Sequence, residues 1–324
     1  MRPKKTIEVL ILILAALLPA CSKHLAQALE KKTAKDSFMM YGPMEFYGAR
    51  SEHVVTDVPY AANEPYSRDL TLDVYWNDHS GKAPIVVNIH GGGWMIGDKQ
   101  AANSVYRSKY LAARGYVVAN VNYRMLPGAP IQTQVEDVMG AVIWMKENAA
   151  RFGADPCRVG VTGGSAGGHL TVMVAWASDD PYFQPTGHSA SAYRADVKAA
   201  VPFYAALELE EALGLGNEDL KPWSEAYFTR TARASDRALI FEHISPKNHL
   251  SKNIPPTFFI CGTQDEFGFY HDALAYRDRL LELGVPTGLY SALGAPHGFD
   301  ARYGEKYSTE ALKATADWFD KYLK

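Results

Sequence analysis

The chain alternates short apolar runs with longer segments whose apolar residues recur every three or four positions. Two early segments, Val54–Tyr60 and Leu70–Trp76, alternate apolar and polar residues, as half-buried strands of an antiparallel hairpin do. Later runs are mostly apolar, as expected of parallel strands that are covered on both faces. The predicted parallel strands are Ile85–Ile89, Val117–Asn122, Val159–Thr162, Ala199–Tyr204, Thr257–Ile260 and Gly288–Ser291.

Segments with helical spacing lie between these strands. The apolar residues of Ile131–Phe152 fall on one helical face, and the closing segment Ser308–Leu323 has the same property. The inward face of the closing segment is predicted to carry Leu312, Ala316, Phe319 and Leu323. This alternation predicts an α/β fold with a mostly parallel central sheet, right-handed crossovers and flanking helices, preceded by an antiparallel N-terminal hairpin.

The stretch Glu208–Asn248 interrupts this alternation. It carries the aromatic residues Trp223, Tyr227 and Phe228 and lies between two predicted strands. We expect residues 208–248 to form a small cap that shapes a binding pocket. A surface helical insertion without such a role is the alternative.

The sequence Gly163-Gly164-Ser165-Ala166-Gly167 reads G-x-S-x-G and lies between a predicted strand and a helix-like run. In that context the turn exposes a serine oxygen at the top of the sheet, above a helix N-terminus. Gly163 and Gly167 let the strand and the helix approach closely. The pattern alone is weak, because an ordinary Gly-Ser turn has the same letters.

Partners for a nucleophilic serine follow later in the chain. Asp265 comes just after the predicted strand Thr257–Ile260, and His297 lies in a Gly/Pro loop after the last strand. The order Ser, Asp, His is that of α/β-hydrolases, and each residue follows a strand, where active sites in parallel sheets assemble. Glu266 and Asp272 are competing acids nearby. Turn formation or helix capping is the alternative role for Asp265.

A glycine-rich loop, His90-Gly91-Gly92-Gly93-Trp94, follows another apolar strand. Attack on an ester carbonyl places negative charge on oxygen, and preorganised backbone N–H groups stabilise that charge. The donors would be Gly91 and Gly92, together with Ala166, which follows the serine. His90 is expected to brace the loop rather than transfer protons. The P-loop pattern and a strand-led G-x-G-x-x-G are both absent from the sequence, which argues against nucleotide binding.

With these residues the chain resembles the α/β-hydrolase esterases that carry an HGGG motif, a group that includes the hormone-sensitive-lipase-like esterases. It is most similar to the feruloyl/acetyl-xylan-esterase-like branch. The matching stretches are Asn88–Lys99, Val121–Arg124, Phe152–Pro156, Gly163–Leu170, Ser245-Pro246 and Pro296–Phe299. The resemblance extends from about Val54 to Lys324 and implies the α/β-hydrolase fold and its catalytic machinery. The chain departs from the lipase-like group at Gly164, where aspartate is common, and directly after Asp265.

The N-terminus has the pattern of a leader. Arg2, Lys4 and Lys5 precede the apolar run Val9–Leu18, which is too short to span a bilayer comfortably. Residues 1–20 are therefore predicted to be a signal peptide, residues 21–50 a tether and residues 51–324 the catalytic domain. The segment before Cys21 resembles a bacterial lipobox, so we expect lipidation of Cys21 and a cell-envelope lipoprotein. Simple cleavage near Ala20, which would give a periplasmic or secreted protein, is the alternative.

Composition narrows the functions further. The 324 residues are 47% hydrophobic, which suits one large domain with a full core. The net charge is −3 and no basic cluster appears in the body, so nucleic-acid binding has no support. Cys157 precedes one strand and Cys261 follows another, which places them at opposite ends of the sheet and disfavours a disulfide.

Together these features predict an exported serine carboxylesterase that needs neither a metal nor another cofactor, in which Ser165 attacks, His297 transfers protons and Asp265 orients the imidazole. Resemblance and export suggest small acyl or hydroxycinnamoyl esters as substrates, on small molecules or oligosaccharides. The membrane would be contacted through the lipid anchor only. A serine peptidase or amidase on the same fold is the first alternative, and a non-catalytic binding protein is the second.

Overall fold

The computed structural model describes residues 51–61, 70–209, 234–302 and 305–324. The predicted leader, the tether with Cys21 and the central part of the expected cap, residues 210–233, lie outside these ranges. Among the described residues, no helix is both long enough and apolar enough to cross a membrane.

The described residues form one eight-stranded sheet with the strand order β1-β2-β4-β3-β5-β6-β7-β8. Its strands are β1 (His53–Pro59), β2 (Thr71–Trp76), β3 (Ala83–Ile89), β4 (Val117–Val121), β5 (Ala154–Gly164), β6 (Ala199–Phe203), β7 (Thr257–Gly262) and β8 (Thr287–Ala292). The β1–β2 and β2–β4 pairs are antiparallel, and the remaining neighbours are parallel. The predicted N-terminal hairpin and the mostly parallel sheet are therefore confirmed.

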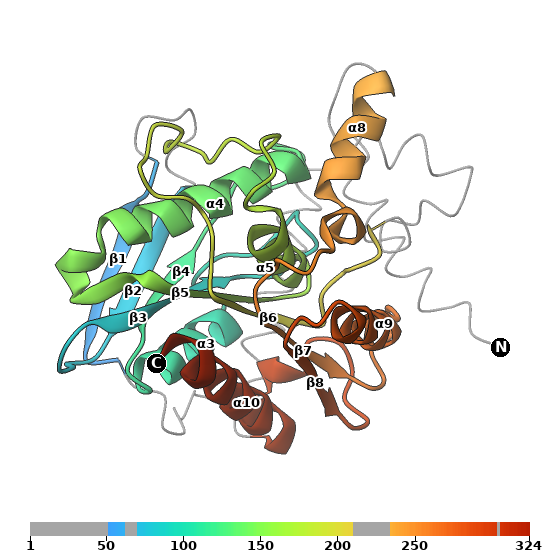
Figure 1. The fold of residues 1–324 in the computed structure, drawn as a ribbon. Helices are drawn as coiled ribbons and strands as arrows, with labels where there is room; N and C mark the ends of the chain where they lie inside the picture. Colours follow the sequence, from blue (N-terminus) through green and yellow to red (C-terminus); the bar gives the residue numbers. More distant parts are fainter. Residues whose placement is uncertain (1–50, 62–69, 210–233, 303–304) are drawn as a thin grey trace, which may run out of the picture. The chain divides into compact units, whose positions relative to one another are not determined.

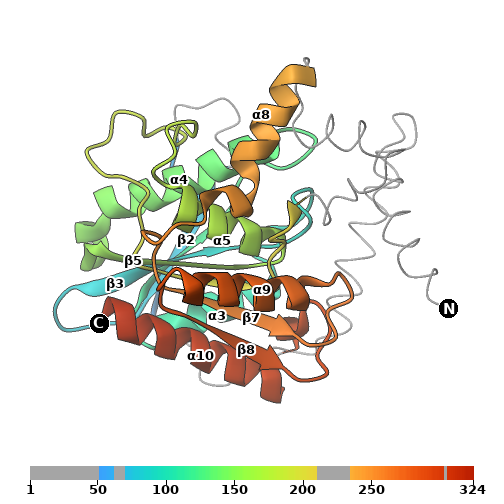
Figure 2. The ribbon, with the colours of Figure 1, turned by 45° about the vertical axis from the view of Figure 1, so that its right-hand side comes forward.

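Helices cover both faces of this sheet. They are α3 (Ala102–Ala112), α4 (Ile131–Glu147), α5 (Ala166–Ala177), α8 (Ala234–Ile244), α9 (Phe269–Glu282) and α10 (Lys306–Leu323), with short 3-10 turns η2 (Ala149–Phe152), η3 (Pro246–His249) and η4 (Phe299–Ala301). Figures 1 and 2 show α4, α5 and α9 on one face and α3 and α10 on the other. This three-layer arrangement is the α/β-hydrolase fold.

The core lies between the sheet and these two helical layers. Strands β3, β4 and β6 are buried along their whole length, as their apolar sequences predict. The four predicted inward residues of α10 are also buried, so the helical periodicity located that face correctly. Trp318, beside this face, packs against Phe258 with ring centroids 5.1 Å apart.

The strand register gathers five loops at one edge of the sheet. Ile89 is paired with Gly163, and Gly163 with Pro202, so β3, β5 and β6 end side by side. Phe203 pairs with Ile260, and Gly262 pairs with Ala292, which brings the ends of β7 and β8 to the same edge. Residues that follow these strands therefore meet in space, although they are far apart in the sequence.

Cys157 is exposed and Cys261 is buried, and both are free thiols. This agrees with the prediction that their positions on the sheet disfavour a disulfide.

Candidate active site

Ser165 occupies a sharp turn between β5 and α5. Its φ of 58° and ψ of −119° are unusual for a residue with a side chain. The turn is fixed because the Ser165 amide donates to the Phe203 carbonyl at 3.0 Å, and the Ser165 carbonyl accepts from the His169 amide at 2.9 Å. A methyl group at Gly163 would lie 2.5 Å from the Gly167 carbonyl oxygen, so strand and helix approach as closely as predicted.

The structure brings the three predicted residues Ser165, His297 and Asp265 into one hydrogen-bonded chain. His297 Nε2 lies 3.0 Å from Ser165 Oγ, and His297 Nδ1 lies 2.8 Å from Asp265 Oδ2. A carboxylate only accepts, so Nδ1 carries the proton toward Asp265 and Nε2 is free to accept the serine proton. This is the geometry that a serine needs to become a nucleophile.

The Asp265 carboxylate is enclosed by the protein. Its side chain is fully buried, and its Oδ1 accepts from the Phe267 amide at 3.0 Å. Cys261 Sγ lies 3.8 Å from Oδ2, and burial, together with the Asp265 charge, raises the pKa of this thiol. Cys261 therefore stays protonated and is not a competing nucleophile.

The two competing acids occupy other positions. The Glu266 carboxylate accepts from the backbone amide of His297 at 3.0 Å, so it anchors the histidine loop rather than the imidazole. Asp272 lies in the first turn of α9. Among the described residues, Asp265 is thus the carboxylate bonded to the His297 ring.

Aromatic side chains surround the His297 imidazole. Tyr204, Phe267 and Phe269 meet it edge to face, with ring centroids 4.6, 4.8 and 5.6 Å away. Phe269 is buried, whereas Phe267 remains 42% exposed. Phe267 therefore offers an apolar surface directly beside the His297 ring, and the sequence analysis did not single it out.

Behind the imidazole lies a buried polar network that sequence reasoning also missed. Tyr204, whose φ is 32°, donates its hydroxyl to Asp300. The other oxygen of Asp300 pairs with Arg107 of α3 at 2.6 Å, and Arg107 also donates to Asn88 of β3 at 3.0 Å. The network links the histidine loop to the strand that precedes the glycine-rich loop. No local sequence pattern predicts this network, because Arg107 and Asp300 are 193 positions apart.

The glycine-rich loop packs directly against the serine turn. A methyl group at Gly91 would lie 2.6 Å from the Gly164 carbonyl oxygen and 3.4 Å from Ser165 Cβ. Gly92 has a φ of 128°, a conformation that glycine adopts readily. Ala166 begins α5 and is buried. The three residues predicted to supply N–H donors are thus adjacent to the serine or part of the loop that touches it.

The His90 side chain contacts the backbone of its own loop. Its Nδ1 donates to the Gly91 carbonyl at 2.8 Å, and its ring stacks on Tyr123 with centroids 4.4 Å apart. Burial lowers the pKa of His90, so the ring is neutral at neutral pH. These contacts support the expected bracing role.

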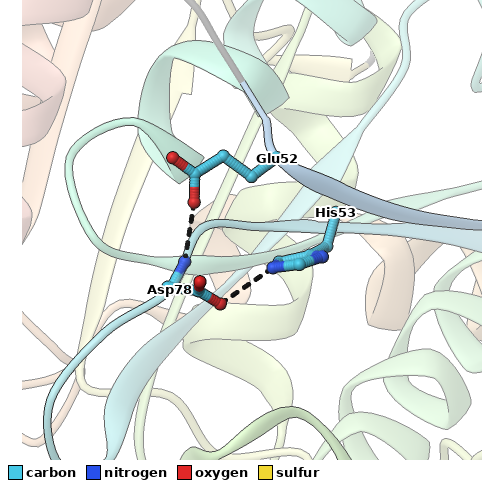
Figure 3. Close-up of side chains that lie close together, drawn as sticks. All are labelled: Glu52, His53 and Asp78. Atoms are coloured by element: carbon cyan, nitrogen blue, oxygen red, sulfur yellow. Dashed lines mark hydrogen bonds and ion pairs between the residues drawn. The ribbon is translucent and has the colours of Figure 1, made fainter.

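One group of side chains has the composition of a metal site. Glu52, His53 and Asp78 place a ligand atom each within 4.8 Å of one another (Figure 3). These polar groups already form hydrogen bonds with one another. His53 Nε2 lies 2.8 Å from Asp78 Oδ1, and the Glu52 carboxylate accepts from the Asp78 backbone amide at 3.2 Å. The group lies at the end of the β1–β2 pair opposite the Ser165 edge, so it does not take part in chemistry at Ser165.

The fold and the site geometry together define an α/β-hydrolase. The BD-FAE family model matches residues 72–280, and the chain belongs to this family. The matched range includes Ser165 and Asp265 and ends before His297.

Curated relatives carry esterase names. Esterase LipQ of Mycobacterium tuberculosis is 30% identical over 263 residues, which is 80% of this chain and 59% of that protein, so the chain spans little more than half of its length. Versiconal hemiacetal acetate esterase of Dothistroma septosporum is 31% identical over 228 residues, 68% of this chain and 67% of that protein.

Solved structures share the fold at lower identity. Esterase B of Lactobacillus rhamnosis superposes with a TM-score of 0.74 at 23% identity, covering 92% of this chain and 94% of that one. A truncated carbohydrate esterase from gut microbiota gives 0.71 at 21% identity, covering 86% and 98%. These similarities show the α/β-hydrolase fold.

Proposed function

We propose that this chain is a serine carboxylesterase. The observation that carries the proposal is the continuous hydrogen-bonded chain from Ser165 through His297 to the buried Asp265, beside the glycine-rich loop. The esterase names of its relatives agree with it.

In the proposed reaction, His297 Nε2 takes the Ser165 proton as the oxygen attacks the ester carbonyl. Asp265, held against Nδ1, keeps the required tautomer and stabilises the imidazolium that forms. The oxyanion is bound by backbone N–H groups of Gly91, Gly92 and Ala166. The alcohol leaves with the proton from His297, and a water activated by the same imidazole then hydrolyses the acyl-enzyme.

The substrate is proposed to be a small acyl or hydroxycinnamoyl ester, on a small alcohol or a carbohydrate. The exposed Phe267 ring beside His297 suits an apolar or aromatic group of the substrate. A fold neighbour described as a carbohydrate esterase makes carbohydrate esters a reasonable class to test.

The decisive panel combines p-nitrophenyl esters of increasing acyl length, acetylated xylan, methyl ferulate and the matching p-nitroanilides. We expect ester hydrolysis to be faster than anilide hydrolysis, because p-nitroaniline is a poorer leaving group than p-nitrophenol. Ser165→Ala is the control and should be inactive. Faster anilide cleavage would favour a peptidase or amidase, and inactivity of the wild type on every substrate would favour a binding protein.

We also propose that the chain is exported and anchored through a lipid on Cys21, on the strength of the leader sequence alone. Each buried acyl CH₂ contributes roughly 0.8 kcal/mol to membrane binding, so two acyl chains hold a protein at the bilayer. Cys21→Ser should move the protein from the membrane to the aqueous fraction in a detergent-partition assay, with unchanged turnover. A wild-type protein found wholly in the aqueous phase would indicate simple leader cleavage.

A further inference from the structure

Trp94, at the end of the glycine-rich loop, is held in a conformation that costs energy. It is buried, and its φ of 61° is unfavourable for a residue with a bulky side chain. Such a conformation persists only where the surroundings fix it. The Trp94 carbonyl accepts from the Leu126 amide at 2.9 Å and from Gln134 Nε2 at 3.0 Å, which fixes the backbone from two sides.

The third restraint on Trp94 comes from His169. The indole Nε1 of Trp94 donates to His169 Nδ1 at 3.3 Å, and an indole can only donate. Nδ1 must therefore be the bare acceptor nitrogen, and Nε2 must carry the proton, which it donates to the Ile244 carbonyl at 2.9 Å. Both ring nitrogens are thus assigned, and the imidazole is neutral with one tautomer.

His169 lies one helical turn after the serine, on the nucleophile helix α5. Its backbone amide donates to the Ser165 carbonyl at 2.9 Å, and its side chain is fully buried. Burial lowers the pKa of His169 to about 4, in keeping with a ring that is neutral at neutral pH. One residue therefore connects the serine turn through its backbone to Trp94 through its side chain.

The glycine-rich loop between the Ser165 turn and Trp94 is short and is stabilised by its own hydrogen bonds. The amides of Met95 and Ile96 donate to the Gly92 carbonyl at 3.1 and 3.0 Å. At the other end, Gly91 touches the serine turn at Gly164. Any displacement of Trp94 is therefore passed to the Gly91–Gly93 backbone, which carries the proposed oxyanion donors.

We infer that His169 is a positioning residue for the oxyanion hole: it holds Trp94, and through Trp94 it sets the Gly91–Gly93 backbone against the Ser165 turn. This inference rests on the proposed function and deepens it. His169 does not itself touch the reacting atoms, and it acts only through the geometry of the N–H donors.

Two substitutions separate the two nitrogens of His169. His169→Gln retains a donor near the position of Nε2 and loses the acceptor for Trp94, whereas His169→Asn retains an acceptor near Nδ1 and loses the donor to Ile244. Trp94→Phe removes the same indole bond from the other side. Trp176→Phe is the matched control, because Trp176 on the same helix donates its indole N–H to Thr257 Oγ1 at 3.1 Å, away from the loop.

We expect His169→Gln and Trp94→Phe each to lower kcat by about 10- to 100-fold with KM changed less than about threefold, because a misplaced donor weakens transition-state binding selectively. The double variant should be no worse than the poorer single variant, since both remove one interaction. His169→Asn should recover kcat to within about fivefold of wild type. Trp176→Phe should lower Tm and leave kcat unchanged.

A spectroscopic measurement follows the bond itself. In a ¹H–¹⁵N spectrum of the six tryptophan indoles, the Trp94 signal, assigned by its loss in Trp94→Phe, should shift in His169→Gln and stay near its wild-type position in His169→Asn. Wild-type kcat in His169→Gln, or equal loss of kcat in the Gln and Asn variants, would overturn the inference. A wild-type protein without activity on esters would instead overturn the proposed function. Failure of the inference and failure of the proposed function are therefore distinguishable.

Discussion

Gly167→Ala tests whether the position of the glycine-rich loop depends on its close contact with α5. A methyl group at Gly167 would lie 2.4 Å from the carbonyl oxygens of both Ile89 and His90, and Cβ atoms essentially never come within 3.0 Å of a heavy atom outside their own and adjacent residues. The chain before Gly91 must therefore move away from α5 by about 0.6 Å, the difference between these two distances. A shift of this size in a catalytic group lowers rates by roughly 10- to 100-fold.

The loss of stability should be small enough to leave the protein folded, because domains are stable by about 5–15 kcal/mol. Overpacking costs about 1–3 kcal/mol, but alanine in a helix gains up to about 1 kcal/mol over glycine, so the net loss is roughly 0–3 kcal/mol. Steady-state kcat on p-nitrophenyl acetate and urea denaturation measure the two effects. Gly160→Ala is the matched control, because its methyl would meet the side chains of Phe319 and Leu323 at 2.7 and 2.9 Å, remote from the site. Wild-type kcat in a folded Gly167→Ala protein would refute the reasoning.

Two further predictions concern the acid and the buried histidine. Asp265→Asn should lower kcat/KM by about 10⁴-fold in a steady-state ester assay, because an amide favours the wrong His297 tautomer, and a comparable loss in Glu266→Gln would assign the acid to Glu266 instead. Burial lowers the pKa of His169 from 6.5 to about 4, against the opposing effect of its hydrogen bond to the Ile244 carbonyl. Below pH 6.5 the His169 imidazole is therefore protonated in the unfolded chain but stays neutral in the folded chain. The free energy of unfolding should fall by up to about 3 kcal/mol between pH 6.5 and pH 4 and then level off. Urea denaturation across this range should show that component in the wild type and not in His169→Gln, and identical pH profiles would contradict the assignment.

The sequence was sufficient to predict the elements and the three residues of the hydrogen-bonded chain. Apolar runs located the strands, and Ser165, Asp265 and His297 each follow one, so the parallel sheet brings them to the same edge. The predicted strand ends were less accurate. Strand β5 runs from Ala154 to Gly164 and is longer than the apolar run that indicated it, because polar residues at its start also pair with β3.

The contacts that support the site could not be predicted from the sequence. Tyr204 looks like the last residue of a buried strand, and only the fold shows that its ring meets His297 and its hydroxyl meets Asp300. His169 reads as one more residue of a buried helix, and its role emerges only because Trp94, 75 positions away, points an indole N–H at it. Hydrogen bonds between distant segments leave no periodic pattern, so local reasoning cannot detect them.

The central claim is that Ser165 is the nucleophile of an ester hydrolase. The most direct measurement is reaction of the full chain with a fluorophosphonate, followed by intact-mass analysis and peptide mapping. Our account predicts one adduct, located on Ser165, formed in step with the loss of esterase activity and absent from Ser165→Ala. An adduct on another residue that abolishes activity, or full ester turnover by Ser165→Ala, would contradict it.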